Sequence, residues 1–371
     1  MKRNFLAFIL IVLSILVYAQ KQVNILQVPG SKEFCKIEEK GISVLPSGRF
    51  VTPVGDLIRI THDPFGMAIS PDGKKAVTLH NGVFTVVDLA SLSHTRIPSY
   101  DEKIASPLSN GSFLGVAFAP DSKTIFLSGG DNGAVIIYDI SALQRLDSIS
   151  LNGKINGEDF VDSFTSDLLL NERNNELLVL DRGNFRMVRI DLTIKKITAS
   201  IKVGRQPFGL ALSPDKNLAF VANVGMYEYP LVQGMDSTNY HSMMINWHPY
   251  GNNSKASIEG TVIDGKRIPG VGSPLVPEAM SVFVINLSTS KVINKFKTGH
   301  QIGHMIEDAE VVGGASPNSI AVGNKYAYVT NATNDNISVI DYKNHKIVDH
   351  IQIKVDRRID RYRGLLPFGI T

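Results

Sequence analysis

Residues 64–73 read PFGMAISPDG, and the return of this stretch along the chain decides the fold. Residues 207–215 (PFGLALSPD) and 113–121 (FLGVAFAPD) are clear copies, and weaker copies open at 165–170 (TSDLLL) and 316–322 (SPNSIAV). Each copy is followed by a short apolar run, a polar turn rich in Gly or Asn, a run that ends in an acidic or amide residue, and a last short strand. The sequence therefore predicts five repeats of one unit.

The period of the repeat can be read from the acidic or amide residue that ends the third run of each unit. These residues are Asp88, Asp139, Asp191, Asn286 and Asp341. The intervals between them are 51, 52, 95 and 55 residues, so the third interval holds one unit and about forty extra residues. Because they recur once per unit, we expect them to accept hydrogen bonds at a turn rather than to do chemistry.

Four short strands per unit, with turns between them and no helical stretch, predict an all-β protein, a β-propeller of four-stranded blades. A single sheet of this kind is apolar on both faces, and stacking against its neighbours buries both. The glycine that recurs before the first apolar run, as in Gly66 and Gly209, is expected near the crowded axis, where only a residue without a side chain fits. The alternative fold, a β-sandwich, lacks a sequence period of this type.

The two ends of the repeat array do not coincide with a unit. Residues 367–371 (PFGIT) copy the opening of the unit, so we expect the chain to be truncated at the start of a further repeat. Residues 57–60 resemble the closing strand that precedes each later unit. The sequence does not decide how a ring would be closed from these two ends. Strands from residues 22–60 are one source of the pairing that closure needs.

The first 19 residues are typical of a secretory signal. Lys2 and Arg3 precede an almost wholly apolar run over residues 5–17, and Val17 and Ala19 are the small residues before a cleavage that leaves Gln20 first. We therefore expect a signal peptide at 1–19, a propeller domain at 20–371, and a periplasmic or extracellular location. An uncleaved N-terminal anchor is the alternative, and no later stretch is apolar enough to span a membrane.

Composition excludes several classes of protein. With 43% hydrophobic and 20% charged residues, the chain is neither disordered nor collagen-like. The formal charge of +3 includes two basic residues of the leader, so the mature surface is near neutral and gives no reason to expect a nucleic-acid partner. Cys35 is the one cysteine, which rules out an internal disulfide, and we expect it to be partly buried.

Residues 328–331 read YVTN, and residues 220–223 (FVAN) are a near copy. On this motif the chain resembles the YVTN-repeat (YncE-like) β-propeller family from about residue 45 to the end, within the broader WD40/YVTN-like repeat proteins. Residues 45–49 (LPSGR), 52–55 (TPVG), 180–186 (LDRGNFR), 203–209 (VGRQPFG) and 311–319 narrow the resemblance to one subgroup. In that subgroup a propeller, usually of seven blades, precedes a phosphoesterase domain of the alkaline phosphatase type.

The resemblance implies that this chain corresponds to the non-catalytic propeller part, without the phosphoesterase half. We therefore expect an exported binding or interaction module rather than an enzyme, with a phosphoesterase domain or another protein as its partner. The alternative is a hydrolase-related protein, phosphoesterase or lactonase-like, whose catalytic part is absent or unrecognised. No nucleophile elbow, phosphate loop or two-metal ligand set is visible in the sequence, and no cofactor is expected.

Two groups of residues are candidate ligand contacts. Arg182, Arg205 and Arg363 lie in loops that flank inner strands, where a propeller places them around one mouth of its central channel. There they would bind a small anionic ligand or a carboxylate-bearing partner, or else remain as solvated loop charge. His300 and His304 have the i, i+4 spacing of a metal pair, with Glu307 and Asp308 close by, but Gly303 disfavours a helix and we expect a surface loop.

The insertion within the fourth repeat, residues 226–278, departs most from the pattern. It is rich in aromatic side chains that suit contacts to glycans or proteins, and the alternative is a self-packed loop that covers a blade edge. The residues expected to form this interaction loop are Tyr227, Tyr229, Tyr240, Trp247, His248 and Tyr250.

Overall fold

The computed structural model describes residues 27–38, 41–52, 54–101, 103–230, 232, 234–235, 238–243, 254–306, 309–354 and 364–371. The predicted signal peptide at 1–19 lies outside these residues. The chain divides into two compact units, Met1–Arg59 and Ile60–Thr371. Among the described residues, no helix has the length and apolar character that crossing a membrane requires.

The first unit holds one small sheet. Strand β1 (Ser43–Val44) pairs antiparallel with β2 (Phe50–Val51), and the described part of the unit contributes no strand to a four-stranded sheet. Residues 57–60 are not in a strand, so the prediction of a closing strand there was wrong. Cys35 is exposed, which also contradicts the expected partial burial.

The second unit contains five four-stranded sheets within its described residues, each an antiparallel meander of consecutive strands. The first two are β3 (Gly66–Ile69), β4 (Lys75–His80), β5 (Val83–Asp88), β6 (His94–Ile97), and β7 (Val116–Phe118), β8 (Thr124–Ser128), β9 (Ala134–Asp139), β10 (Gln144–Ser150). The third is β13 (Thr165–Asn171), β14 (Glu176–Asp181), β15 (Arg186–Asp191), β16 (Lys196–Lys202). The last two are β17 (Pro207–Leu212), β18 (Leu218–Asn223), β21 (Ser281–Asn286), β22 (Lys291–Lys297), and β25 (Pro317–Val322), β26 (Tyr326–Asn331), β27 (Asn336–Asp341), β28 (Lys346–Gln352). The predicted fold class is confirmed: the protein is all-β, with several four-stranded sheets consistent with propeller blades.

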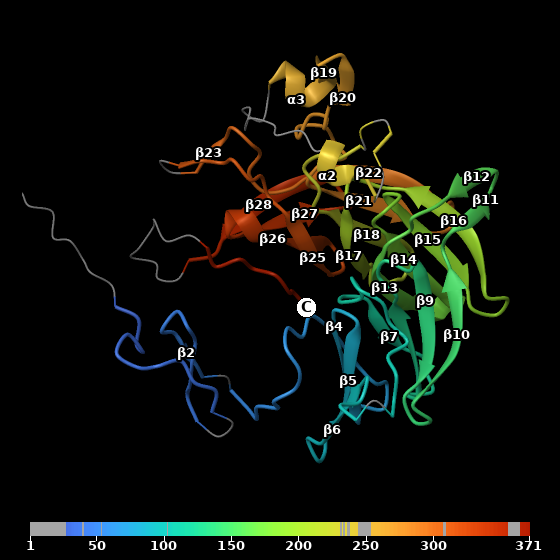
Figure 1. Cartoon of the computed structure of the whole chain (residues 1–371), viewed down its shortest axis with the longest axis vertical. Helices are drawn as coiled ribbons and strands as arrows, with labels where there is room; N and C mark the ends of the chain where they lie inside the picture. Colours follow the sequence, from blue (N-terminus) through green and yellow to red (C-terminus); the bar gives the residue numbers. More distant parts are fainter. Residues whose placement is uncertain are drawn as a thin grey trace, which may run out of the picture. The chain divides into compact units, whose positions relative to one another are not determined.

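The hydrophobic core lies between the sheets. Four clusters of buried residues join the first sheet to the second, the second to the third, the third to the fourth and the fourth to the fifth. Strand β8 shows why both faces are apolar: Ile125 and Leu127 pack toward the first sheet, and Phe126 between them packs toward the third. Consecutive sheets therefore lie side by side, as Figure 1 shows.

The repeated acidic and amide residues have the predicted structural role. Asp139 Oδ1 accepts the backbone N–H groups of Ser141 (2.7 Å) and Ala142 (2.9 Å), at the turn that follows β9. Asp191 and Asn286 accept equivalent pairs of N–H groups at the ends of β15 and β21. Each such bond satisfies a turn donor that the sheet leaves unpaired.

The repeated glycines lie where neighbouring first strands approach closely. A Cβ on Gly66 would lie 2.0 Å from the carbonyl oxygen of Leu114, and one on Gly209 would lie 2.1 Å from that of Asn318. No side chain fits at either position, which confirms why the sequence places glycine there.

The remaining elements are short. Strands β18 and β21 flank residues 224–280, which contain helices α2 (Tyr240–Met243) and α3 (Lys255–Glu259) and the hairpin of β19 (Gly260–Ile263) and β20 (Lys266–Pro269). Two other hairpins are β11 (Gly153–Ile155) with β12 (Glu158–Phe160), and β23 (Met305–Ile306) with β24 (Ala309–Glu310). Two 3₁₀ turns are η1 (Glu172–Asn174) and η2 (Ala332–Asn334).

Candidate functional site

The first strands of successive sheets meet around one central region. The backbone N–H of Gly66 donates to the carbonyl of Phe113 (2.9 Å), and that of Gly115 to the carbonyl of Ser166 (2.9 Å). Four phenylalanine rings cluster at the end where these strands begin, with neighbouring centroids 4.8–6.3 Å apart. They are Phe65, Phe113, Phe208 and Phe368. The rings pack edge to face or tilted, as aromatic pairs prefer.

A cavity of about 860 Å³ runs along these strands from the phenylalanine rings. Its walls come from all five first strands and from the C-terminal segment, and they reach Pro71 and Glu172 in the turns after β3 and β13. The volume lies within the range of small-molecule sites, and most of the wall is aliphatic or aromatic, as such sites usually are.

Polar side chains from two sheets interrupt this apolar wall: Asp167 from the third, and Asn318 and Ser319 from the fifth. Where three of the repeats carry a glycine that follows Phe or Leu, the third sheet has Ser166-Asp167 and the fifth has Asn318-Ser319. Ser166 Oγ donates to the carbonyl of Pro207 (3.1 Å), and Asn318 Nδ2 donates to that of Pro367 (3.5 Å). In these two sheets a side-chain hydrogen bond, to the next strand or to the C-terminal segment, takes the place of the close backbone contact that glycine permits in the other sheets.

Asp167 is the acidic member of these pairs. Its Oδ1 accepts the backbone N–H of Leu168 (2.9 Å), and its Oδ2 accepts that of Leu210 in the next sheet (3.0 Å). Burial raises the pKa of Asp167 from 3.8 to about 7, against the lowering effect of the two hydrogen bonds. Sequence reasoning missed this residue, although its departure from the glycine of the repeat was visible at 165–170.

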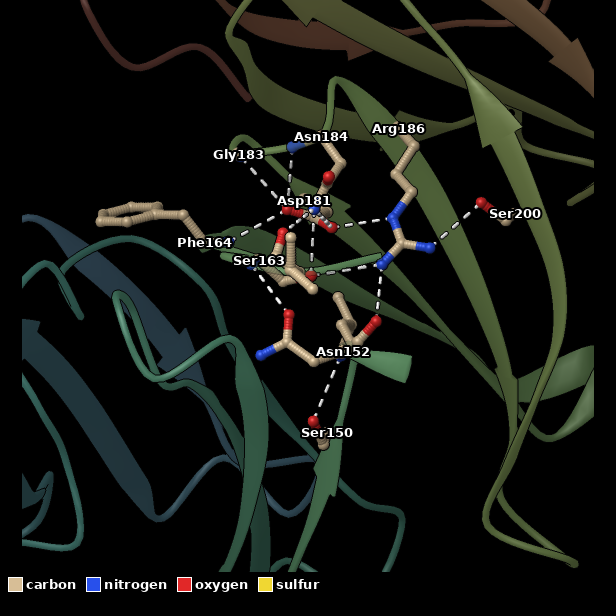
Figure 2. Close-up of polar contacts among 11 residues, drawn as sticks. Ser150, Asn152, Ser163, Phe164, Asp181, Gly183, Asn184, Arg186 and Ser200 are labelled. Carbon is tan, nitrogen blue, oxygen red and sulfur yellow. Dashed lines mark hydrogen bonds and ion pairs between the residues drawn. The ribbon is translucent and has the colours of Figure 1, made fainter. Parts of the chain in front are cut away.

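The predicted arginines lie in loops at the end of the sheets where the first strands begin: Arg182 follows β14, and Arg205 precedes β17. Figure 2 shows the polar network that fixes the loop after β14, with Asp181 at its centre. Asp181 Oδ1 accepts the backbone N–H groups of Phe164 (3.0 Å) and Gly183 (3.1 Å), and Oδ2 accepts Arg186 Nε (2.7 Å). Both members of this ion pair are buried, with side chains 0% and 1% exposed.

The rest of the Arg186 guanidinium is also satisfied. Nη2 donates to the carbonyl of Leu151 (2.6 Å) and to Ser163 Oγ (3.3 Å), and Nη1 donates to Ser200 Oγ (3.2 Å). The guanidinium also lies 3.5 Å from the ring centroid of Phe160, a cation–π contact. A buried charge of this kind needs complete pairing, so the network is a structural support for the loop.

Arg182 lies in that loop and is partly buried, and burial lowers its pKa. Its Nε donates to Gln206 Oε1 (2.5 Å), and no bond from its two terminal nitrogens to another described residue is present. Arg205 is 6% exposed, and it is committed to the inserted segment through Glu228 Oε1 (3.0 Å) and the carbonyls of Met226 (2.9 Å) and Ser273 (2.8 Å). Arg363 lies outside the described residues.

The inserted segment is held by a second cation. Lys297 Nζ donates to the carbonyls of Pro274 (3.0 Å), Val276 (3.2 Å) and Ala279 (2.5 Å), and burial lowers its pKa to about 8. Of the predicted interaction loop, Tyr229 is 73% and Tyr240 44% exposed, while Tyr227 is partly buried. Trp247, His248 and Tyr250 lie outside the described residues.

His300 and His304 do not form a metal site with any other described residue. The ring of His300 faces that of His350 (5.6 Å between centroids), and His304 is exposed in a turn. Glu307 and Asp308 lie outside the described residues, and among those described no three His, Cys, Asp or Glu side chains gather as metal ligands.

Neither a family model nor a curated protein matches the sequence. What the site can do therefore follows from its geometry. The cavity can enclose a small apolar or amphipathic molecule, and Asp167 can pair with a cation or exchange a proton near neutral pH.

Proposed function

We propose that this chain is an exported binding module of the YVTN-repeat β-propeller type, which takes a small ligand into the cavity between its first strands. The observation that carries the proposal is the cavity itself, about 860 Å³ in volume and walled by all five first strands. A site built from the ends of rigid sheets is pre-formed, so a ligand loses little affinity to ordering of the protein.

The YVTN motif supports the family part of this proposal. Asn331, the last residue of the motif, is fully buried at the end of β26 and donates to Asn336 Oδ1 and Ser338 Oγ (both 2.8 Å). Asn223 ends the near copy in β18 and donates to the carbonyl of Ser281 (3.2 Å). In both sheets the motif asparagine thus links the second strand to the third, a reason for a repeat family to keep it.

Export rests on the leader at 1–19. We expect the protein to accumulate in the periplasm or medium with Gln20 at its N-terminus. Fractionation followed by N-terminal sequencing tests this, and a cytoplasmic protein that retains Met1 would contradict it.

The proposed partners are a phosphoesterase domain or another protein, and a small anionic ligand at Arg182. The exposed Tyr229 and Tyr240 support a protein contact at the inserted segment. Affinity capture from a periplasmic fraction with the native chain and a Tyr229→Ala/Tyr240→Ala variant tests this part. Loss of one protein from the variant sample is the expected result, and identical captures would contradict it.

Ligand entry into the cavity is tested by NMR with a panel of small apolar and amphipathic compounds. We expect shift changes at residues 66–69, 114, 116–118, 167–170 and 208–210, which line the cavity. Leu169→Trp, which adds volume to the wall, should weaken binding without loss of the fold. Shift changes confined to residues outside the cavity would contradict the proposal.

A hydrolase is the second candidate, and Asp167 is the observation that favours it, because an acid with a pKa near 7 suits proton transfer. Assays on p-nitrophenyl phosphate and simple lactones, with and without Zn²⁺, Mg²⁺ and Ca²⁺, distinguish the two. If the native protein turns over one of these substrates and Asp167→Asn abolishes the turnover, the protein is an enzyme rather than a binding module.

A further inference from the structure

We infer that the central cavity selects organic cations, an ammonium group on an apolar body, and that Asp167 recognises the ammonium group. The inference rests on the proposed function, since it needs a ligand in the cavity. It goes further because it assigns the chemical class of that ligand and the residue that determines it.

The charge of the cavity wall carries the first step. Its described lining includes two acidic residues, Asp167 and Glu172, and no lysine, arginine or histidine. A carboxylate in a mostly apolar wall attracts a cation strongly, because little water competes for it there. An anionic ligand would find no positively charged side chain on the same surface and would be repelled by its acidic residues.

The geometry of Asp167 carries the second step. One backbone N–H holds each carboxylate oxygen, from Leu168 (2.9 Å) and from Leu210 (3.0 Å), which fixes the orientation of the group. Each oxygen keeps acceptor capacity for a further donor. No described residue supplies a cation to this carboxylate, so an ammonium group would complete its pairing rather than displace a partner.

The apolar part of the ligand has a matching surface. Leu114, Leu169 and Leu210 line the cavity, and the rings of Phe65 and Phe208 lie at one end of it. An alkyl or aryl body would bury apolar area against these side chains, and a cation near the rings gains further attraction from their faces.

The test compares matched probes that differ in charge alone. A series of aryl-alkyl amines of increasing chain length is titrated at pH 8, where Asp167 is largely ionised, beside the alcohols of the same skeletons. The readout is the Kd from calorimetry or NMR titration. We expect each amine that binds to bind about 10-fold or more tightly than its alcohol, the gain typical of a charge-assisted hydrogen bond.

Two variants and a control assign the preference to Asp167. Asp167→Asn should reduce the ratio of amine affinity to alcohol affinity to near 1. Asp167→Ser should have the same effect, and it introduces the residue type that the fifth sheet has at the equivalent position, Ser319. Glu172→Gln, at the exposed turn of the cavity, should leave most of the preference in place. Circular dichroism and melting curves show which variants are folded.

The outcomes separate this inference from the proposed function. If amines and alcohols bind with equal Kd, the cavity binds ligands but does not select cations, and the inference alone is wrong. If Glu172→Gln abolishes the preference and Asp167→Asn does not, Asp167 is not the recognising residue. If no member of either series binds, the cavity is not a ligand site and both proposals fail.

Discussion

At the scale of the residue, two glycines near the axis have no room for a methyl group. Gly209→Ala should destabilise the protein by about 1–3 kcal/mol or more, because the new Cβ would lie 2.1 Å from a backbone oxygen that cannot move alone. Gly369→Ala is the matched control, since it lies in the same motif and its Cβ would meet nothing within 4 Å. Urea denaturation measures both, and equal losses would contradict the steric argument.

Asp167 predicts a dependence of stability on pH. Its pKa is about 7 in the folded protein and 3.8 in the unfolded chain, so the folded state binds the proton more tightly between these values. The contribution of this group to stability is therefore present in full below pH 4 and is lost as pH rises to 7.

Asp167→Asn should remove the decrease in stability that ionisation of Asp167 causes as pH rises. Relative to the native protein, the variant should gain about 2–4 kcal/mol of unfolding free energy between pH 4 and pH 8. Denaturant titrations across that range measure the difference. A constant difference between the two proteins at every pH would show that the carboxyl does not titrate as argued.

The buried pair of Asp181 and Arg186 predicts a large effect of charge removal. Arg186→Leu leaves the Asp181 carboxylate buried without its cation, which should cost about 3–5 kcal/mol. Adding Asp181→Asn should recover part of this loss. Lys103→Ala breaks an ion pair that is 81% and 54% exposed, and should change stability by less than about 1 kcal/mol.

At the scale of the element, one buried arginine holds the inserted segment to the sheets. Arg205→Ala removes bonds to Met226, Glu228 and Ser273, so chymotrypsin should cleave residues 226–278 faster in the variant than in the native protein while the sheets stay resistant. Lys202→Ala, a change to an exposed side chain next to the same loop, is the control. Equal cleavage of native and Arg205→Ala proteins would contradict the anchoring role.

The strands were predictable because their signals are local and repeated. The apolar runs, the turn residues and the period all agree, so errors in one repeat are corrected by the others. Residues 57–60 imitate a strand in composition alone, and a short apolar run of that kind forms a strand only where a neighbouring edge pairs with it.

The cavity was harder to predict than the strands. Asp167 and Ser319 lie in the two copies that match the repeat least, where they occupy the position of the repeated glycine. The sequence does not show that this position lines a cavity, because the cavity forms only when the first strands of all five sheets come together. Arg205 illustrates the opposite difficulty: the sequence places it near the channel, but its bonds go to a segment up to 68 residues further along the chain. Such long-range pairings have no local sequence signal.

At the scale of the whole molecule, contacts at the centre connect sheets that share no hydrophobic core. Phe65 precedes the first sheet and Phe208 lies in the fourth, and their ring centroids are 6.3 Å apart. Phe65→Ala and Phe208→Ala should therefore be non-additive, with a coupling of about 0.5–1.5 kcal/mol in a double-mutant cycle. Strict additivity would show that the rings act independently.

The inserted segment leaves and returns to the fourth sheet at almost the same point. The backbone N–H of Met280 donates to the carbonyl of Gly225 (3.1 Å), so the two ends of the insertion are already joined by the sheet itself. The entropy of closing a loop grows only with the logarithm of its length, and each doubling costs about 0.6 kcal/mol. Lengthening or shortening the chain between Glu228 and Ser273, which leaves the partners of Arg205 and Lys297 in place, is therefore thermodynamically inexpensive, and this position of the sheet can accept new sequence while the strands on either side remain the same.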